Sequence, residues 1–502
     1  MSTIDHMQQG LEKALQAAAQ ADDRELAGKV REEGRRLVFI LHGLLRTSRL
    51  HDKDNAAFEA PSKEFAITLN GLLDLLGAVH VVCVEDQIYV NDIRLRGNPR
   101  EQQMIEAFVQ ELARHNVGGV SFHGPLQPEA VREMAHLIAG KPSDESPRAT
   151  LEQRLSSLGD IALTGTHRFR IGGEPTQQQK DYEEAMRRGA TVVAEAVQNL
   201  AADRIPNPLP VRRAVIDMVN SLREDPVEGS LEPFRRTAGR AGEQHLLSVT
   251  SLALTLGEAL ELPEGALSDL GVAAMLHDIG YTKVPDRTGH CAAGARLLLR
   301  QRGFHEAKIR RLLMVLEHHD PYTPKDQAAA AKLKRSERMP SLFARILRIA
   351  NDYDLLVSPR PGQAPPMSPA MALARMWAAR ETEYDPHLMA LFVQVLGLFP
   401  PGTLLELTDG RWAISISGAR DRERFSWPLV RIVREADGTF TDATQELDLY
   451  ETRAHLRPAR ILDPSRMGVD VSKHVRRKKE EPPDQDMEED DEDIGAAEAR
   501  MH

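Results

Sequence analysis

The chain has 502 residues, a formal net charge of -11 and two cysteines. This length is enough for two or three domains, each with its own hydrophobic core. Two distant cysteines exclude a disulfide scaffold and fit a reducing compartment. The N-terminus lacks the basic and apolar regions of a signal peptide, and no stretch approaches a membrane span, so we expect a cytoplasmic protein.

Most of the negative charge lies near the C-terminus, where residues 480–493 hold ten acidic side chains and no basic one. The rest of the chain is therefore close to neutral. With the preceding run KHVRRKK and two prolines, this composition predicts a disordered charged tail over residues 465–502. Nucleic-acid binding is not expected, because the basic run lacks interleaved aromatic residues and has an acidic neighbour.

The first third of the chain predicts a helical or flexible segment over 1–34 and an α/β accessory domain over 35–172. Its expected elements are, in order, helices in FILHGLLRTSRL and AITLNGLLDLLG, two strands in VHVVCVEDQIYVNDIRLR, a helix over 100–115, a strand GVSF and a helix after Pro128. No chemistry is evident here. Its position alone suggests sensing, regulation or dimerisation.

A linking helix is predicted over residues 176–204, with an apolar stripe at Val192, Val193, Ala196, Val197 and Leu200. Packing of this stripe on the domain that follows is the preferred interpretation, and pairing of two subunits in a homodimer is the alternative. Residues 205–400 are expected to be mainly helical. Residues 401–455 alternate and contain two Asp-Gly turns, which predicts a small β extension.

The central region carries histidines and aspartates in a pattern typical of a metal site. Its candidate ligands are His245, His277, Asp278, His290, His318, His319 and Asp352. Neutral imidazoles and carboxylates are ligands that borderline divalent metals accept. The apolar helix that leads to His277 should be buried, and Gly280 is expected to end it. Polar groups beside core helices are costly unless they are paired or bind metal, so the pattern predicts a metal site.

These residues resemble the HD-domain metal-dependent phosphohydrolases, and specifically the HD-GYP branch of cyclic dinucleotide phosphodiesterases. HDIGYTKVPD is similar to that family's segment HD-x-G-K-(I/V)-x-(I/V)-P-D, and residues 290–294 to its H-P-x-x-G. NDYDLLVSPRP is similar to its A-D-x-Y-D-A-L-x-x-x-R-P. The resemblance covers roughly residues 205–450 and implies an all-helical catalytic core, so the fold class expected is mainly α.

The resemblance also implies a mechanism with two divalent metals per chain and a hydroxide that bridges them. Asp278 would bridge the metals, His245, His277 and Asp352 would complete one site, and His290, His318 and His319 would complete the other. Lys283 and Arg360 would contact the phosphate of a cyclic dinucleotide such as cyclic di-GMP, or of another phosphoester. Iron or manganese is expected first, although such ligands also accept zinc, nickel or cobalt.

Several departures from the family pattern leave other functions open. The loop H-H-E-x-x-D-G-x-G-Y-P is replaced by HHDPYTPKDQAAAAKLKRSERMP, and Tyr281 stands where the family has a phosphate-contacting lysine. Ala241 replaces a glutamate that holds a third metal in some members, which favours two metals. The alternatives are a catalytically degenerate signalling module that binds a nucleotide or a protein, and an HD phosphohydrolase of another phosphoester. A second His-Asp pair, His51-Asp52, is expected to lie on the surface.

Overall fold

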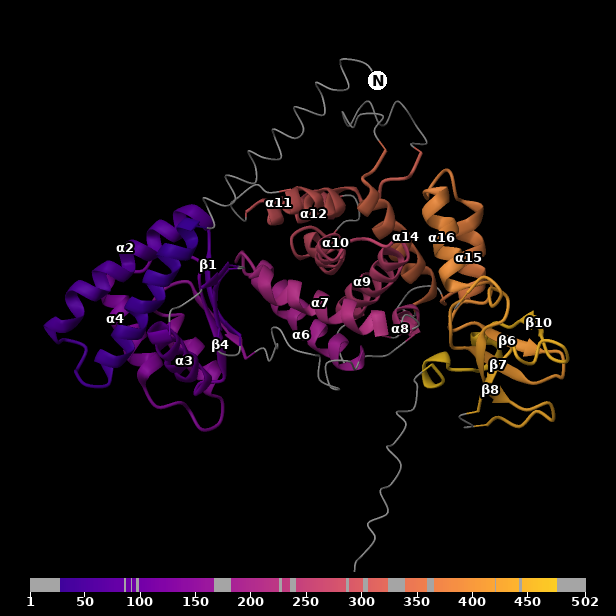
Figure 1. Ribbon diagram of the computed structural model, residues 1–502, viewed down its shortest axis with the longest axis horizontal. Coiled ribbons are helices and arrows are strands. Elements are labelled where there is room, and N and C mark those ends of the chain that lie inside the picture. Colours follow the sequence, from indigo (N-terminus) through magenta and orange to yellow (C-terminus); the bar gives the residue numbers. More distant parts are fainter. Residues whose placement is uncertain are drawn as a thin grey trace, which may run out of the picture.

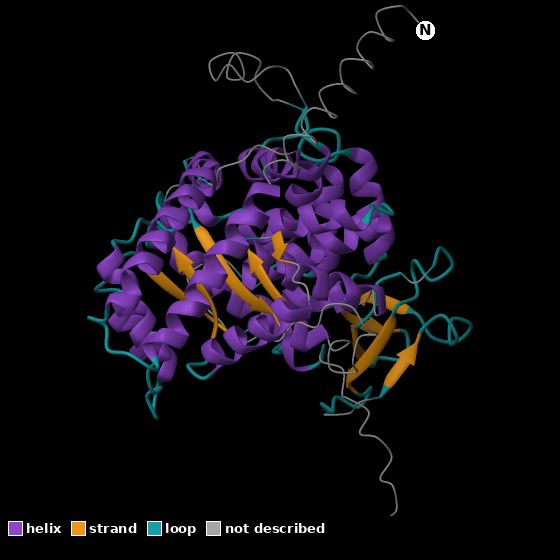
Figure 2. Cartoon of the chain, turned by 60° about the vertical axis from the view of Figure 1, so that its left-hand side comes forward, coloured by secondary structure: helices purple, strands orange, loops and turns teal. Residues whose placement is uncertain are grey.

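The computed structural model places a predominantly helical body between two small sheets (Figures 1 and 2). It describes residues 28–84, 87–91, 93–95, 99–166, 182–224, 228–234, 241–285, 289–300, 306–323, 339–358, 365–419, 421–441 and 445–475. No helix in these ranges is long and apolar enough to cross a membrane. The fold class expected from the sequence, mainly α with an N-terminal α/β unit and a C-terminal β extension, is confirmed.

The N-terminal unit is an antiparallel sheet with the order β3-β2-β1-β4-β5, covered by helices. The strands are β1 (Val79–Val84), β2 (Gln87–Val90), β3 (Ile93–Leu95), β4 (Val117–Phe122) and β5 (Ile161–Gly165). The helices are a segment over 28–48, α2 (Glu59–Leu76), α3 (Pro99–Ala113), α4 (Pro128–Ala139) and α5 (Pro147–Leu155). One hydrophobic core joins these helices to one face of the sheet. Three strands, β1 to β3, form where the sequence predicted two, because Asn91 takes a positive φ and turns the chain again.

The other face of this sheet packs against the helical body. Val82 and Tyr89 form a small apolar cluster with Leu209, in helix α7 (Pro208–Glu224), and the guanidinium of Arg213 lies over the Tyr89 ring. An ion pair between Arg204 and Asp160, 2.8 Å long, adds a polar contact between the two parts. The accessory unit is therefore docked on the helices that precede the candidate site.

The helical body is built around two central apolar helices, α9 (Ala241–Ala259) and α10 (Glu264–Leu276). Helix α10 is buried on every side from Leu267 to Leu276, as expected of a helix enclosed by others, and its one buried carboxylate, Asp269, pairs with arginines of a neighbouring helix. The surrounding helices are α6 (Tyr182–Ala201), α7, α8 (Glu228–Leu231), α11 (His290–Leu299), α12 (Glu306–Glu317), α14 (Leu342–Val357), α15 (Pro369–Ala378) and α16 (Pro386–Leu396).

The predicted linking helix corresponds to α6, and residues 176–181 of that prediction lie outside the described part. Val192, Val193, Ala196 and Leu200 are buried in a core shared with α7, α9 and α10. The preferred interpretation, packing on the domain that follows, is therefore confirmed.

The C-terminal β extension has the strand order β10-β6-β7-β8-β9, all antiparallel. Its strands are β6 (Leu404–Leu407), β7 (Trp412–Ser415), β8 (Leu429–Arg434), β9 (Glu446–Asp448) and β10 (Pro458–Ile461). The prediction that the disordered tail begins at residue 465 is wrong at its boundary. Helix α17 (Pro464–Met467) and a 3-10 turn (Val471–Lys473) follow the sheet, and Val475 is buried against the helical body. Residues 476–502 lie outside the described part.

Candidate metal centre

Four helices bring most of the predicted ligands to one place. His245 lies in the first turns of α9, and His277 and Asp278 directly follow α10. His290 is the first residue of α11, and His318 and His319 follow α12. In the described part of the chain, the potential ligand atoms form two groups, each with all atoms within 4.8 Å of one another: His245, His277 and Asp278 in one, and His290, Cys291, His318 and His319 in the other.

The Asp278 carboxylate lies between the two groups and offers one oxygen to each. Oδ2 lies 3.5 Å from Nε2 of His245 and 3.5 Å from Nε2 of His277. Oδ1 lies 3.2 Å from Nε2 of His290 and 3.5 Å from Nε2 of His318. This division of the two oxygens is the arrangement that a carboxylate bridge between two metal ions requires.

Hydrogen bonds at the far side of three rings fix their orientation. His245 Nδ1 is 2.7 Å from Asp354 Oδ2, and His277 Nδ1 and His318 Nδ1 are 2.7 and 2.9 Å from the backbone carbonyls of Ala274 and Val315. A carbonyl or carboxylate accepts the Nδ1 proton, which leaves Nε2 with a lone pair that points to Asp278. The three imidazoles are therefore oriented as metal ligands are.

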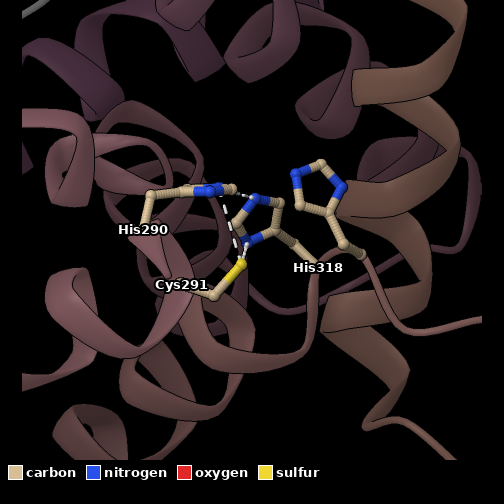
Figure 3. A group of neighbouring side chains, drawn as sticks. His290, Cys291 and His318 are labelled. Carbon is tan, nitrogen blue, oxygen red and sulfur yellow. Dashed lines mark hydrogen bonds between the residues drawn. The ribbon is translucent and has the colours of Figure 1, made fainter. Parts of the chain in front are cut away.

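The second group includes Cys291, which the sequence analysis did not consider as a ligand. Figure 3 shows its sulfur directed at the rings of His290 and His318. The Sγ atom is 3.5 Å from His290 Nε2 and 3.9 Å from His318 Nδ1. In the sequence, its position directly after the predicted ligand His290 is the feature that could have indicated it. In the family motif a proline holds this place, so the resemblance gave no reason to expect a ligand there.

The site is buried on the histidine side and opens at Asp278. His277, His290 and His318 are fully buried, whereas the side chain of Asp278 keeps 20% of its exposure. Burial raises the pKa of the Asp278 carboxyl, but the surrounding histidines outweigh this effect and hold its pKa well below the usual range. Burial also lowers the pKa of His277 to about 4. His277 is therefore neutral beside an ionised carboxylate, which is the state that metal binding needs. Burial also acts on His245 and His318, but hydrogen bonds, first of all with Asp278, outweigh it and raise their pKa to about 9, so a metal ion would have to displace these protons.

Asp352, expected as a ligand of the first metal, belongs to neither group. Its carboxylate accepts hydrogen bonds from Tyr384 Oη and Asn351 Nδ2, both at 3.1 Å, and lies 3.7 Å from Arg348. Residues two apart on a helix differ in direction by about 200°. Since Asp354 faces His245, Asp352 faces elsewhere.

Asn351 lies one helical turn before Asp354, so these two residues share a face of α14. It is 1% exposed. If Tyr353 and Asp354 take the Y-D of the motif A-D-x-Y-D, Asn351, and not Asp352, stands at its first Asp. An amide therefore stands where the family pattern has a carboxylate.

Of the two predicted phosphate contacts, the structure describes only Lys283, and its ammonium group is bound away from the candidate ligands. Lys283 forms an ion pair with Asp203 at 2.9 Å and donates to the backbone carbonyl of Ala201 at 3.2 Å, both near the C-terminal end of α6. Arg360 lies outside the described residues, as does most of the altered loop after His319. Tyr281, at the family's lysine position, stacks on His290 with ring centroids 4.1 Å apart.

Gly280 has a different role from the helix stop that was expected. Helix α10 already ends at Leu276, and a 3-10 turn (Ile279–Thr282) follows Asp278. A Cβ on Gly280 would lie 1.8 Å from the carbonyl oxygen of His290. The glycine therefore permits the backbone after Asp278 to touch the start of α11, which brings His290 to the carboxylate.

The donor set fits a pair of divalent metal ions. It offers imidazole nitrogens and a two-oxygen carboxylate, which suit zinc, iron, manganese or cobalt. Among the residues that the structure describes, no hydrogen-bond partner reaches His277 Nε2, although this residue is fully buried. A metal ion at this position would remove the cost of that unsatisfied nitrogen.

Comparisons with known proteins agree with this geometry. A family model described as HD domain matches residues 196–388. The cyclic di-GMP phosphodiesterase PA4108 of Pseudomonas aeruginosa is 28% identical over 195 residues, which are 36% of this chain and 45% of that protein. The chain thus matches less than half the length of this relative.

A solved structure, the HDG"Y"P protein Bd1817 of Bdellovibrio bacteriovorus, is also similar. It shares 13% identity and gives a TM-score of 0.36, over 63% of this chain and 94% of that one. A score this low supports no argument about the site. On the family match and the sequence relative, the chain contains an HD-GYP-like HD domain over residues 196–388.

Proposed function

We propose that the chain is a metal-dependent phosphodiesterase whose substrate is a cyclic dinucleotide. The HD domain and the P. aeruginosa relative, named as a cyclic di-GMP phosphodiesterase, support this reaction class. The observation that carries the proposal is the position of Asp278, whose two oxygens each face a different pair of histidines. One carboxylate that serves two sites is the arrangement needed for attack on phosphorus between two metals.

In this proposal His245, His277 and Asp278 Oδ2 hold one metal ion. Asp278 Oδ1, His290, His318 and His319 hold the other. When bound, the metal ions would lower the pKa of a water molecule and stabilise charge on the phosphate. The protein residues keep the imidazoles oriented, and the buried side chains of the site keep bulk water from the histidine face.

The residues expected to contact the substrate differ between this chain and the family pattern. Lys283 forms an ion pair with Asp203, just after α6. The ring of Tyr281 stacks on His290, and 41% of the Tyr281 surface is exposed. An aromatic face suits a nucleobase better than a phosphate, because bases stack on aromatic rings. We propose that Tyr281 contributes to recognition of the base.

A second candidate, a module that binds a nucleotide without hydrolysing it, is favoured by Asn351. The loss of one carboxylate from this face of α14 weakens the negative field that holds divalent ions. The P. aeruginosa relative does not decide between the two candidates, because only 45% of it is matched.

The test is hydrolysis of a panel of cyclic dinucleotides and a generic phosphodiester by protein purified without oxygen, with metal content measured on the same samples. Asp278→Asn should abolish turnover and lower metal content. The matched control is Asp52→Asn, the same change in the exposed pair His51-Asp52, which should leave both unchanged.

The two candidates give different results. Turnover of a cyclic dinucleotide that depends on Asp278 supports the enzyme. Nucleotide binding without turnover, in protein that holds about two metal ions per chain, supports the binding module. Turnover that survives Asp278→Asn would refute the assignment of the site.

A further inference from the structure

Cys291 is the one potential ligand of the two groups that the proposed function leaves unused. It is the second residue of α11, adjacent to His290, and is 8% exposed. Both cysteines of the chain are free and buried, and Cys83 lies in strand β1 of the accessory sheet. Cys291 therefore forms no disulfide bond, and a role for its buried thiol must come from the side chains around it.

Two imidazole rings lie next to the Cys291 sulfur, His290 through Nε2 at 3.5 Å and His318 through Nδ1 at 3.9 Å. In the described part of the chain, its hydrogen-bond contacts are the rings of His290 and His318 (Figure 3). Both histidines are fully buried, and both place Nε2 near Asp278 Oδ1. Val315 accepts the Nδ1 proton of His318, so Nε2 is the atom of that ring left for a metal.

Two of the distances between these donor atoms are of the size found between two ligands of one metal ion at tetrahedral angles. With metal–nitrogen bonds of about 2.05 Å and a metal–sulfur bond of about 2.3 Å, two nitrogens lie about 3.3 Å apart, and nitrogen and sulfur about 3.6 Å. The observed separations are 3.3 Å between Nε2 of His290 and Nε2 of His318, and 3.5 Å between Cys291 Sγ and His290 Nε2. Two neutral imidazoles have no reason to bring their nitrogens this close unless a proton or a cation lies between them.

We propose that Cys291 supplies a thiolate to the metal held by His290 and His318. The ligand set of this site is then nitrogen and sulfur with one carboxylate oxygen, which selects zinc, iron or cobalt over manganese or magnesium. The thiol proton leaves to solvent when the metal binds. This inference rests on the two-metal site of the proposed function, and it adds a ligand and a metal preference that the family pattern does not contain.

The experiment is titration of the metal-free full-length protein with Co²⁺, followed by absorption spectroscopy. A cysteine thiolate bound to cobalt gives an intense charge-transfer band in the near ultraviolet, which imidazole and carboxylate ligands do not give. The wild type should show this band, and Cys291→Ser should lose it while it keeps the weaker visible bands of bound cobalt. Cys83→Ser is the matched control, because it removes the other buried thiol, and its band should be unchanged.

A second measurement uses metal preference and needs no activity. Cys291→Ser should weaken Zn²⁺ binding by about tenfold or more, and Mn²⁺ binding should change less, because manganese has little affinity for sulfur. Circular dichroism of the metal-free proteins shows whether the variant is folded, and Cys291→Ala repeats the test if the serine variant is not.

Each outcome bears on one proposal or the other. A charge-transfer band that depends on Cys291, without turnover of any phosphodiester, supports the thiolate ligand and refutes the enzyme. Turnover with two bound cobalt ions and no such band refutes the thiolate ligand alone. A wild type that binds no cobalt refutes both, and a band that persists in Cys291→Ser refutes this inference.

Discussion

Substitution of Asp354 by asparagine should release metal from the site although Asp354 is not a ligand. Its Oδ2 is 2.7 Å from His245 Nδ1, and its Oδ1 accepts hydrogen bonds from Ser248 at 2.5 Å and Ser358 at 2.7 Å. The asparagine has nearly the same shape and keeps one oxygen for the imidazole. It removes the charge that makes His245 a stronger base and a better ligand.

The expected loss of metal affinity is about 10- to 100-fold, the range seen when such supporting carboxylates are changed. This corresponds to about 1.4–2.8 kcal/mol of binding free energy, at about 1.4 kcal/mol for each factor of ten. The assay is competition between the protein and a chelator of known affinity. Urea unfolding of the metal-free protein is measured in parallel, because Asp354 is 1% exposed and its hydrogen bonds also stabilise the fold.

Asp352→Asn is the matched control, since it makes the same chemical change two residues away on the same helix. Its carboxylate contacts Tyr384 and Asn351 instead of a ligand, so metal affinity should stay within about twofold of the wild type. The reasoning would be refuted if Asp352→Asn lost metal as strongly as Asp354→Asn, because Asp352 would then be the ligand expected from the sequence.

Three further perturbations test the scaffold. Asp269→Ala should lower the free energy of unfolding in urea by about 3–5 kcal/mol, because the buried carboxylate holds two arginines of α12 at 2.7 and 2.6 Å; a loss below about 1 kcal/mol would contradict this. Gly280→Ala should lower both metal content and thermal stability, whereas Gly265→Ala, with nothing within 4 Å of the new Cβ, should not. Burial lowers the pKa of His80 to about 3 and of His123 to about 4, so only the unfolded chain binds these protons between about pH 6.5 and 4, and stability is lost as the pH falls. From pH 7 to 5 each of the two histidines should lower the free energy of unfolding by about 2 kcal/mol. Hydrogen exchange of the amides in strands β1 and β4 tests this. The prediction is refuted if their protection, corrected for intrinsic exchange rates, does not fall with pH.

The sequence predicted those features of the fold that depend on local patterns. The all-apolar stretch before His277 forms a buried helix, and the stripe that begins at Val192 is buried in a core shared with it, because burial of apolar surface decides both. The ligand order also identified four of the helices that meet at the site. These predictions needed only the period of the apolar residues and the chemistry of histidine and aspartate.

What the sequence could not show was which atoms meet across helices that are distant in the chain. The backbone at Gly280 lies directly against the carbonyl of His290. This is a contact between two separate segments of the chain, and no local sequence pattern encodes such a contact. The direction of Lys283 depends in the same way on Asp203, about eighty residues earlier, which holds its ammonium group at 2.9 Å. The position of a lysine next to a catalytic motif in the sequence therefore does not show whether its ammonium group faces the site.

The segment NDYDLL shows how the rotation of one helix decides the chemistry. It contains Asp352 and Asp354, and the resemblance to the family favoured the first as a metal ligand. Each residue turns the side chain by about 100°, so a helix can direct only one of two aspartates spaced by two residues at a given neighbour. Tyr353 is fully buried between them, in one core with Ile346, Ile349 and Ala350, and this buried face sets the rotation of α14 at which Asp354 meets His245 and the serines. The choice of aspartate is therefore made by the packing of the buried face of α14, whose apolar residues have no part in the chemistry.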